Sequence, residues 1–229
     1  GIVTAGDERT LNIRTLPAPG DPLRAALRDG MELGLLIIEL AARRRMRANG
    51  RVGAVADGGF SLALSEIYAN CPKYIQAREV APAAAGNAPE PRRLAGLEDA
   101  AVAIIKQADT FFIASVRPGA GADASHRGGA PGFVRVADAR TILFPDYAGN
   151  MMFNTLGNLA ANPRAGLLFI DWAGGAALQL SGEAEILWDD PRMAGFAGAE
   201  RLVSFRVEAA LLGSAAIGGR LIGYSPFNP

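Results

Sequence analysis

The chain has 229 residues, of which 50% are hydrophobic and 20% are charged, and its formal net charge is zero. This composition is typical of a globular protein with one large domain or two small ones, and the balanced charge argues against nucleic acid or an anionic membrane surface as a partner. The single cysteine and the single histidine exclude an intramolecular disulfide and the zinc motifs that need several such residues. We therefore expect no metal site and a reducing, cytoplasmic compartment. No apolar run is long enough to span a membrane.

The first half of the chain repeats part of the second. Residues 1–11 (GIVTAGDERTL) match residues 132–142 (GFVRVADARTI) at an offset of 131, and residues 34–39 match residues 166–171 at an offset of 132. A weaker match joins residues 60–64 to residues 203–207. Because a repeat indicates architecture more firmly than local propensity, we predict two related structural units. The first unit lacks a counterpart of residues 97–131. We therefore expect a fragment of a longer tandem protein or a first half that is a degenerate copy, and the alternative is that the first half is complete as it stands.

The boundary between the units is predicted from composition. Residues 82–96 contain a Pro/Ala-rich stretch without apolar periodicity, which is typical of an exposed connector. We therefore expect a partial copy at residues 1–81, a connector at 82–96 and a complete domain at 97–229.

Within the first copy, residues 43–47 have the sequence RRRMR. On a strand, Arg43, Arg45 and Arg47 point to one side, so three guanidinium groups are available to a groove. The alternative is a solvated edge strand, where arginine discourages pairing with another chain.

The complete domain is predicted to be an antiparallel barrel with helices at its ends. Apolar residues at helical spacing predict a helix over residues 97–108, and the helical character of residues 152–161 stops at Asn162-Pro163. Strands are predicted at residues 110–116, 133–136, 141–144, 165–170, 176–187 and 201–207. The polar, glycine-rich residues 123–133 are predicted to form a loop that cradles an anion. The fold class is therefore mainly β with α, as a six-stranded barrel and a partial second copy.

Two motifs carry a resemblance to a known family. Residues 125–134 (SHRGGAPGFV) and 145–150 (PDYAGN), the second leading into a predicted helix, resemble motifs of the FMN-binding split-barrel family related to pyridoxamine 5′-phosphate oxidase. The resemblance extends from residue 111 to about residue 186, and residues 66–76 and 225–229 also resemble family segments. It implies a split barrel that pairs with a second barrel and holds FMN between them. The cofactor-binding residues expected on this basis are Ser125, His126, Arg127, Gly128, Gly129, Asn150, Asn154 and Thr155, together with Arg45 and Arg47 of the first copy.

The chain departs from the family at one informative place. The oxidase usually has a lysine or arginine before the helix to hold the FMN phosphate, whereas this chain has Asn154 and Thr155. The chain has only two lysines, so arginine must supply the positive charge.

The resemblance implies an FMN-dependent oxidoreductase that acts on a small molecule and forms a homodimer. A non-catalytic flavin carrier or sensor module, and a cofactor-free assembly domain, are the alternatives, and no residue is assigned as a catalytic acid or base. Nucleic acid and membrane partners are not expected.

Overall fold

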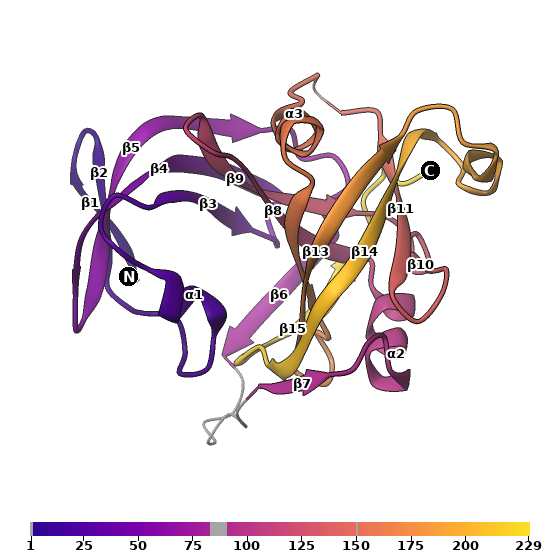
Figure 1. Ribbon diagram of the computed structural model, residues 1–229, viewed down its shortest axis with the longest axis horizontal. Coiled ribbons are helices and arrows are strands. Elements are labelled where there is room, and N and C mark those ends of the chain that lie inside the picture. The colour runs from indigo at the N-terminus through magenta and orange to yellow at the C-terminus, as the bar shows by residue number, and fades with distance from the viewer. Residues whose placement is uncertain (1, 83–90, 150) are drawn as a thin grey trace.

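The computed structural model describes residues 2–82, 91–149 and 151–229 (Figure 1). Two sheets account for most of the fold, and a third sheet has only two strands. The class is mainly β with α, as the sequence predicts.

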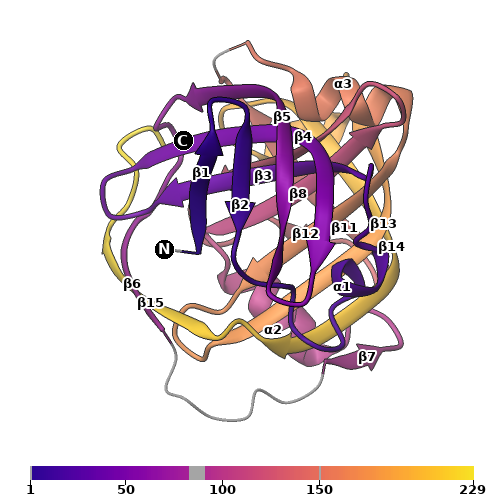
Figure 2. The same cartoon turned by 90° about the vertical axis from the view of Figure 1, so that its left-hand side faces the viewer.

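The first sheet is formed by the N-terminal part of the chain. Its five strands are all antiparallel and lie in the order β1 (Val3–Asp7), β2 (Thr10–Ile13), β5 (Gly59–Asn70), β4 (Arg44–Ala56) and β3 (Glu32–Glu39). A single short helix, α1 (Pro22–Ala26), connects β2 to β3 and is capped by the Asp21 side chain. Figure 2 shows this sheet lying across the second one.

The second sheet is larger and carries most of the core. Its order is β10 (Arg135–Val136), β11 (Thr141–Tyr147), β14 (Ala199–Ser214), β13 (Ala176–Leu187), β12 (Arg164–Ile170), β8 (Thr110–Arg117) and β9 (Gly121–Gly128), and β7 (Arg92–Leu94) pairs with β14. Two helices and a 3₁₀ turn connect these strands: α2 (Asp99–Gln107), α3 (Asn154–Ala161) and η1 (Pro191–Gly195). A cluster of fully buried phenylalanines, Phe111, Phe144, Phe169 and Phe205, forms the centre of the core.

The second sheet does not close into a barrel. Among the described residues, no ladder joins β9 to β10, so the sheet curls around the core without closing. The predicted six-stranded barrel is therefore an open sheet in this structure. Strands lie at all six predicted places, but the one predicted at residues 133–136 is only Arg135–Val136.

Residues 123–133 were predicted to form a loop, and the structure corrects this prediction for the first part of the segment. Residues 121–128 form β9, which pairs with β8 from Thr110↔Gly128 to Arg117↔Gly121. Its polar side chains Asp123 and Ser125 are buried because they find polar partners, described below, so their polarity does not indicate solvent exposure.

Both ends of the predicted connector are strands. The third sheet pairs β6 (Ala77–Pro82) with β15 (Ile217–Gly223), and β7 begins at Arg92. These ladders tie the connector's flanks to the C-terminal part of the chain, whereas residues 83–90 lie outside the described residues. The domain boundaries stay a prediction.

The two large sheets share a strand order. The order β1-β2-β5-β4-β3 corresponds to β10-β11-β14-β13-β12, and the matched glycines Gly50 and Gly182 both mark a register shift. A Cβ at Gly50 would lie 2.0 Å from the carbonyl oxygen of Ala63, and one at Gly182 would lie 2.0 Å from that of Arg206. A side chain is excluded at both bulges. These shared features support the predicted repeat, which stays a prediction.

The sheets meet along β3, β4 and β9. A Cβ at Gly34 on β3 would lie 2.7 Å from backbone atoms of Asp123 and Ala124, so glycine allows the two strands to pack at backbone distance. This contact brings the arginines of β4 next to the polar residues of β9.

Candidate functional site

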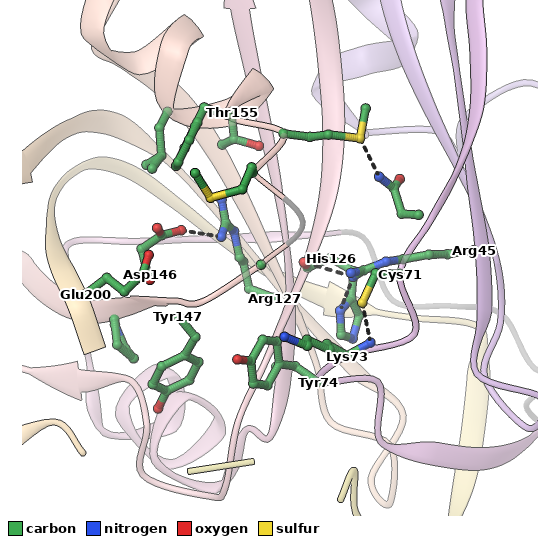
Figure 3. Close-up of a pocket in the computed structure, with 18 of the residues that line it drawn as sticks. Arg45, Cys71, Lys73, Tyr74, His126, Arg127, Asp146, Tyr147, Thr155 and Glu200 are labelled. Atoms are coloured by element: carbon green, nitrogen blue, oxygen red, sulfur yellow. Dashed lines mark hydrogen bonds and ion pairs between the residues drawn. The ribbon is translucent and has the colours of Figure 1, made fainter. Parts of the chain in front are cut away.

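A cavity opens where the first sheet meets the second (Figure 3). Its walls come from β4, the turn at residues 70–74, β9, the end of β11 and the N-terminal turn of α3. The lining residues that matter below are Arg45, Arg47, Asn70, Lys73, Tyr74, His126, Arg127, Asp146, Tyr147 and Thr155. Both halves of the chain therefore contribute to one site.

Arg45 and His126 form the centre of the cavity. Nη1 of Arg45 lies 2.9 Å from Nδ1 of His126, and the imidazole is almost fully buried. An arginine can only donate a hydrogen bond, so Nδ1 is the acceptor and the proton of the neutral ring is on Nε2. Nε2 has no hydrogen-bond partner among the described residues. The cavity thus has a neutral imidazole N–H donor.

The electrostatic environment keeps His126 neutral. Burial lowers its pKa well below 6.5, and the charges of Arg45, Arg127 and Arg78 lower it further. Burial, followed by repulsion from Arg47 and Arg127, also lowers the pKa of Arg45 to about 10, so Arg45 still carries its charge at neutral pH. No ion pair is formed by Arg45 within the described part of the chain. A partly buried guanidinium without a counter-charge favours a bound anion.

Arg47, unlike Arg45, forms a buried ion pair with a carboxylate. Its Nη1 contacts both carboxylate oxygens of Asp123 at 2.8 and 3.0 Å, and both side chains are buried. The hydroxyls of Ser125 and Thr155 lie 3.2 and 3.0 Å from Oδ2 of Asp123 and 2.9 Å from each other. This buried network joins β4, β9 and α3. Ser125 is therefore placed behind the cavity wall and not on it.

A second ion pair braces the opposite wall. Arg127 donates to Oδ1 of Asp146 at 2.6 Å, and Arg201 donates to Oδ2 of the same carboxylate at 2.8 Å. The Nε atom of Arg127 is buried without a partner in the described chain. The shared Asp146 therefore holds Arg127 in place while leaving a donor free.

The turn at residues 70–74 approaches β9 because Gly128 has no side chain. A Cβ at Gly128 would lie 2.0 Å from the carbonyl oxygen of Tyr74. Tyr74 itself has a φ of 65°, its hydroxyl donates to the carbonyl of Ala148 at 2.9 Å, and its ring centroid lies 5.2 Å from that of Tyr147. The two tyrosines give the cavity an aromatic wall.

Four predicted residues are placed away from the cavity or are not described. Gly129 accepts a hydrogen bond at its carbonyl from Gln76, and the Asn154 side chain donates to the hydroxyl of Tyr68 at 2.7 Å. Ser125 belongs to the buried network, and Asn150 lies outside the described residues. The other predicted residues, Arg45, Arg47, His126, Arg127, Gly128 and Thr155, line the cavity.

The structure also differs from the predictions at Arg43 and in the turn at residues 70–74. Arg43 does not join Arg45 and Arg47, because its φ of 50° turns the chain and its guanidinium donates to the carbonyls of Ile75, Gly223 and Tyr224. Lys73 and Tyr74 were not predicted as site residues, although residues 66–76 resemble the family; that resemblance was the signal available for finding them.

Comparison with known proteins identifies the family. The family model for pyridoxamine 5′-phosphate oxidase matches residues 97–216, just over half of the chain. The chain belongs to the pyridoxamine 5′-phosphate oxidase family. The match covers β8, β9, β11 and α3, which supply the C-terminal part of the cavity. A comparison with curated proteins found no match.

Solved structures similar to this member of the pyridoxamine 5′-phosphate oxidase family match about half of it. They include a variant of HupZ from Group A Streptococcus (14% identity, TM-score 0.41, 51% of this chain and 98% of that one). An FAD-binding protein from Mesorhizobium loti has 14% identity and a TM-score of 0.40, covering 54% and 98% of the two chains. An FMN-binding protein from Syntrophomonas wolfei has 11% identity and a TM-score of 0.39, covering 51% and 84%. No helix in the described ranges is long and apolar enough to cross a membrane.

Proposed function

We propose that the cavity between the two sheets binds a flavin, and specifically FMN. The observation that carries this proposal is that three arginines and a histidine line the cavity, each with a side-chain nitrogen that lacks a hydrogen-bond partner in the described chain. The Nε atoms of Arg45, Arg47 and Arg127 and Nε2 of His126 are buried without partners in the described chain. Donors of this kind, three of them on cations, fit an anionic group rich in acceptors, such as a phosphate.

The remaining features of the cavity fit the flavin ring. Oδ1 of Asn70 is buried without a described partner and can accept a hydrogen bond from a ring N–H. Tyr74 and Tyr147 offer flat aromatic surfaces, and the nearby Met151 and Phe153 are exposed by 77% and 44%. Such exposed apolar side chains at the rim of a cavity favour a large planar ligand. Lys73, Arg45 and His126 would hold the phosphate. They would take the place of the lysine or arginine that the family usually has where this chain has Asn154 and Thr155.

Bound FMN would supply hydride or electron transfer, so we propose a flavin-dependent oxidoreductase acting on a small molecule. The residues of this chain bind and orient the flavin. His126 donates a hydrogen bond from Nε2 and is not a proton donor at neutral pH, because its pKa is far below that range. The same observation favours the alternative of a non-catalytic flavin carrier, since neither His126 nor Arg45 titrates near neutrality.

Binding is tested with the purified chain and three flavins. Quenching of flavin fluorescence on titration gives the affinities for FMN, riboflavin and FAD. We expect FMN to bind at least tenfold more tightly than riboflavin, because charge-assisted hydrogen bonds to phosphate contribute about 1.5–3 kcal/mol each. Equal affinities for riboflavin and FMN would contradict the proposal that the cavity binds the phosphate. A failure to bind any of the three flavins would overturn the proposed function.

Two variants make this experiment specific. Arg45→Met removes a lining cation, whereas Arg44→Met removes the adjacent arginine, which is exposed and paired with Glu39. We expect only Arg45→Met to weaken FMN binding while leaving riboflavin binding nearly unchanged. Turnover of reduced nicotinamide with an electron acceptor, measured on the FMN-loaded protein, separates an oxidoreductase from a carrier.

We also propose a homodimer, with one flavin per chain. Each chain already contributes both walls of its cavity, so the stoichiometry does not depend on pairing. Light scattering during size-exclusion chromatography checks the assembly, and a mass equal to the 23.8 kDa of a single chain would contradict the dimer.

A further inference from the structure

A second cavity lies on another part of the molecule and shares no lining residue with the first. It is enclosed by the end of α2, the β6–β15 sheet and the turn after β12. Its polar centre is an ion pair in which Nη2 of Arg78 lies 2.5 Å from Oδ2 of Asp109. The side chains of Arg78 and Asp109 are only 6% and 5% exposed.

This ion pair is incompletely satisfied, in contrast to the pair of Arg47 and Asp123. Both oxygens of Asp123 are in hydrogen bonds, two of them from neighbouring hydroxyls. At the second cavity, Oδ1 of Asp109 and both Nε and Nη1 of Arg78 are buried without a partner in the described chain. Leaving charged groups buried without partners is unfavourable, and a ligand carrying both a donor and an acceptor would satisfy them.

The indole ring of Trp172 adjoins the ion pair and also lines the cavity. The guanidinium of Arg78 lies 5.0 Å from the ring centroid of Trp172, and the indole Nε1 is also buried without a described partner. Gly219 makes room for this arrangement: a Cβ there would lie 2.9 Å from Cε3 of Trp172 and 3.3 Å from Cδ of Arg78. The backbone N–H of Gly219 donates to the carbonyl of Trp172 at 2.9 Å, which fixes the turn against β15.

The charges of the cavity indicate the class of ligand. Asp109 already neutralises Arg78, and Asp171 adds a further carboxylate to the lining, so an anion is not favoured. Ile104, Ile170 and Leu221 provide an apolar wall. We propose that this cavity binds a small, uncharged, planar molecule with a carboxamide or ring lactam group. Its carbonyl accepts from Arg78 or Trp172, and its N–H donates to Asp109. This proposal does not rest on flavin binding.

The test uses nicotinamide as the probe and the indole N–H signals of the full chain, labelled with ¹⁵N at tryptophan. The chain has two tryptophans, and the exposed Trp188 serves as an internal reference that is assigned with Trp188→Phe. We expect a saturable shift of the Trp172 signal and no shift of the Trp188 signal. Benzoate and benzylamine, which carry opposite charges on a similar ring, are expected to bind at least tenfold more weakly.

Neighbouring glycines provide matched variants. Gly219→Ala places a methyl group against Trp172 and Arg78 and displaces them, whereas a Cβ at Gly218 would make an ordinary contact of 3.5 Å with the carbonyl of Trp172. We expect nicotinamide binding to be lost in Gly219→Ala and kept in Gly218→Ala, with both variants folded as judged by the Trp188 signal. The proposal is overturned if nicotinamide causes no saturable shift, if Gly219→Ala binds normally, or if benzoate or benzylamine binds as well as nicotinamide.

Discussion

Arg45 on β4 donates a hydrogen bond to Nδ1 of His126 on β9, and through this contact the first sheet determines which nitrogen of a second-sheet histidine carries the proton. Neither residue has a carboxylate partner within the described ranges. The contact therefore leaves the cavity with a free N–H and a charged guanidinium, the two groups on which the proposed phosphate subsite depends.

The tautomer is directly measurable because His126 is the only histidine. In ¹⁵N spectra of labelled protein, we expect the Nε2–H tautomer at pH 7 and protonation only well below pH 6.5, since burial and the charge of Arg45 both lower the pKa of the ring. Arg45→Met is expected to raise that pKa towards 6.5, whereas Arg44→Met leaves it unchanged. A ring that protonates near pH 6.5 in the unmodified chain would contradict the structure.

His126 also predicts how stability depends on pH. Its pKa is lower in the folded state than in the unfolded state, so below pH 6.5 the unfolded chain binds a proton that the folded chain does not. The free energy of unfolding should therefore fall as the pH decreases below 6.5, by up to about 1.4 kcal/mol per pH unit from this group. Urea denaturation at several pH values checks this, and His126→Gln is expected to have a flatter profile between pH 6.5 and 5. Identical slopes would show that the ring titrates normally.

The ion pair between Arg47 and Asp123 is predicted to hold the two sheets together. Arg47→Met leaves Asp123 buried without its counter-charge, and we expect the free energy of unfolding to fall by about 3–5 kcal/mol. The control is Arg44→Met, which removes an exposed pair and should cost less than about 1 kcal/mol. Denaturant titrations of both variants give the comparison. Equal losses would mean that the buried pair does not join the sheets.

Gly50 and Gly182 lie at equivalent bulges of the two sheets, so we expect alanine at either position to destabilise the protein to a similar extent. Gly50→Ala and Gly182→Ala each place a methyl group 2.0 Å from a carbonyl oxygen of the neighbouring strand, and each is expected to destabilise the protein by about 2–3 kcal/mol. Gly157→Ala on α3, where nothing lies within 4 Å of the new Cβ, should instead stabilise it by about 0.5–1 kcal/mol. Thermal unfolding of the three variants separates the cases, and a tolerated Gly50→Ala would imply a different register in the first sheet.

The sequence predicted much of the secondary structure because its signals are local. Apolar spacing located α2 and α3, and the β-rich runs located the predicted strands of the second sheet. Strand β9 was missed because Asp123, Ser125 and Arg127 look like loop residues until their partners are known. Those partners, Arg47, Thr155 and Asp146, are between 19 and 76 residues away along the chain, and composition carries no information about such distances.

The candidate site, like the secondary structure, could be predicted from the sequence only in part. The motifs at residues 125–134 and 145–150, together with the arginine run of the first copy, were sufficient to predict the family's fold and six of the residues that line the cavity, since these depend on patterns within short segments. Only the tertiary structure decided that Arg45 faces His126 while Arg43 does not, that Ser125 lies behind the wall, and that the sheet stays open. Each of these depends on how two sheets pack against each other, and packing is determined by contacts between segments far apart in the sequence.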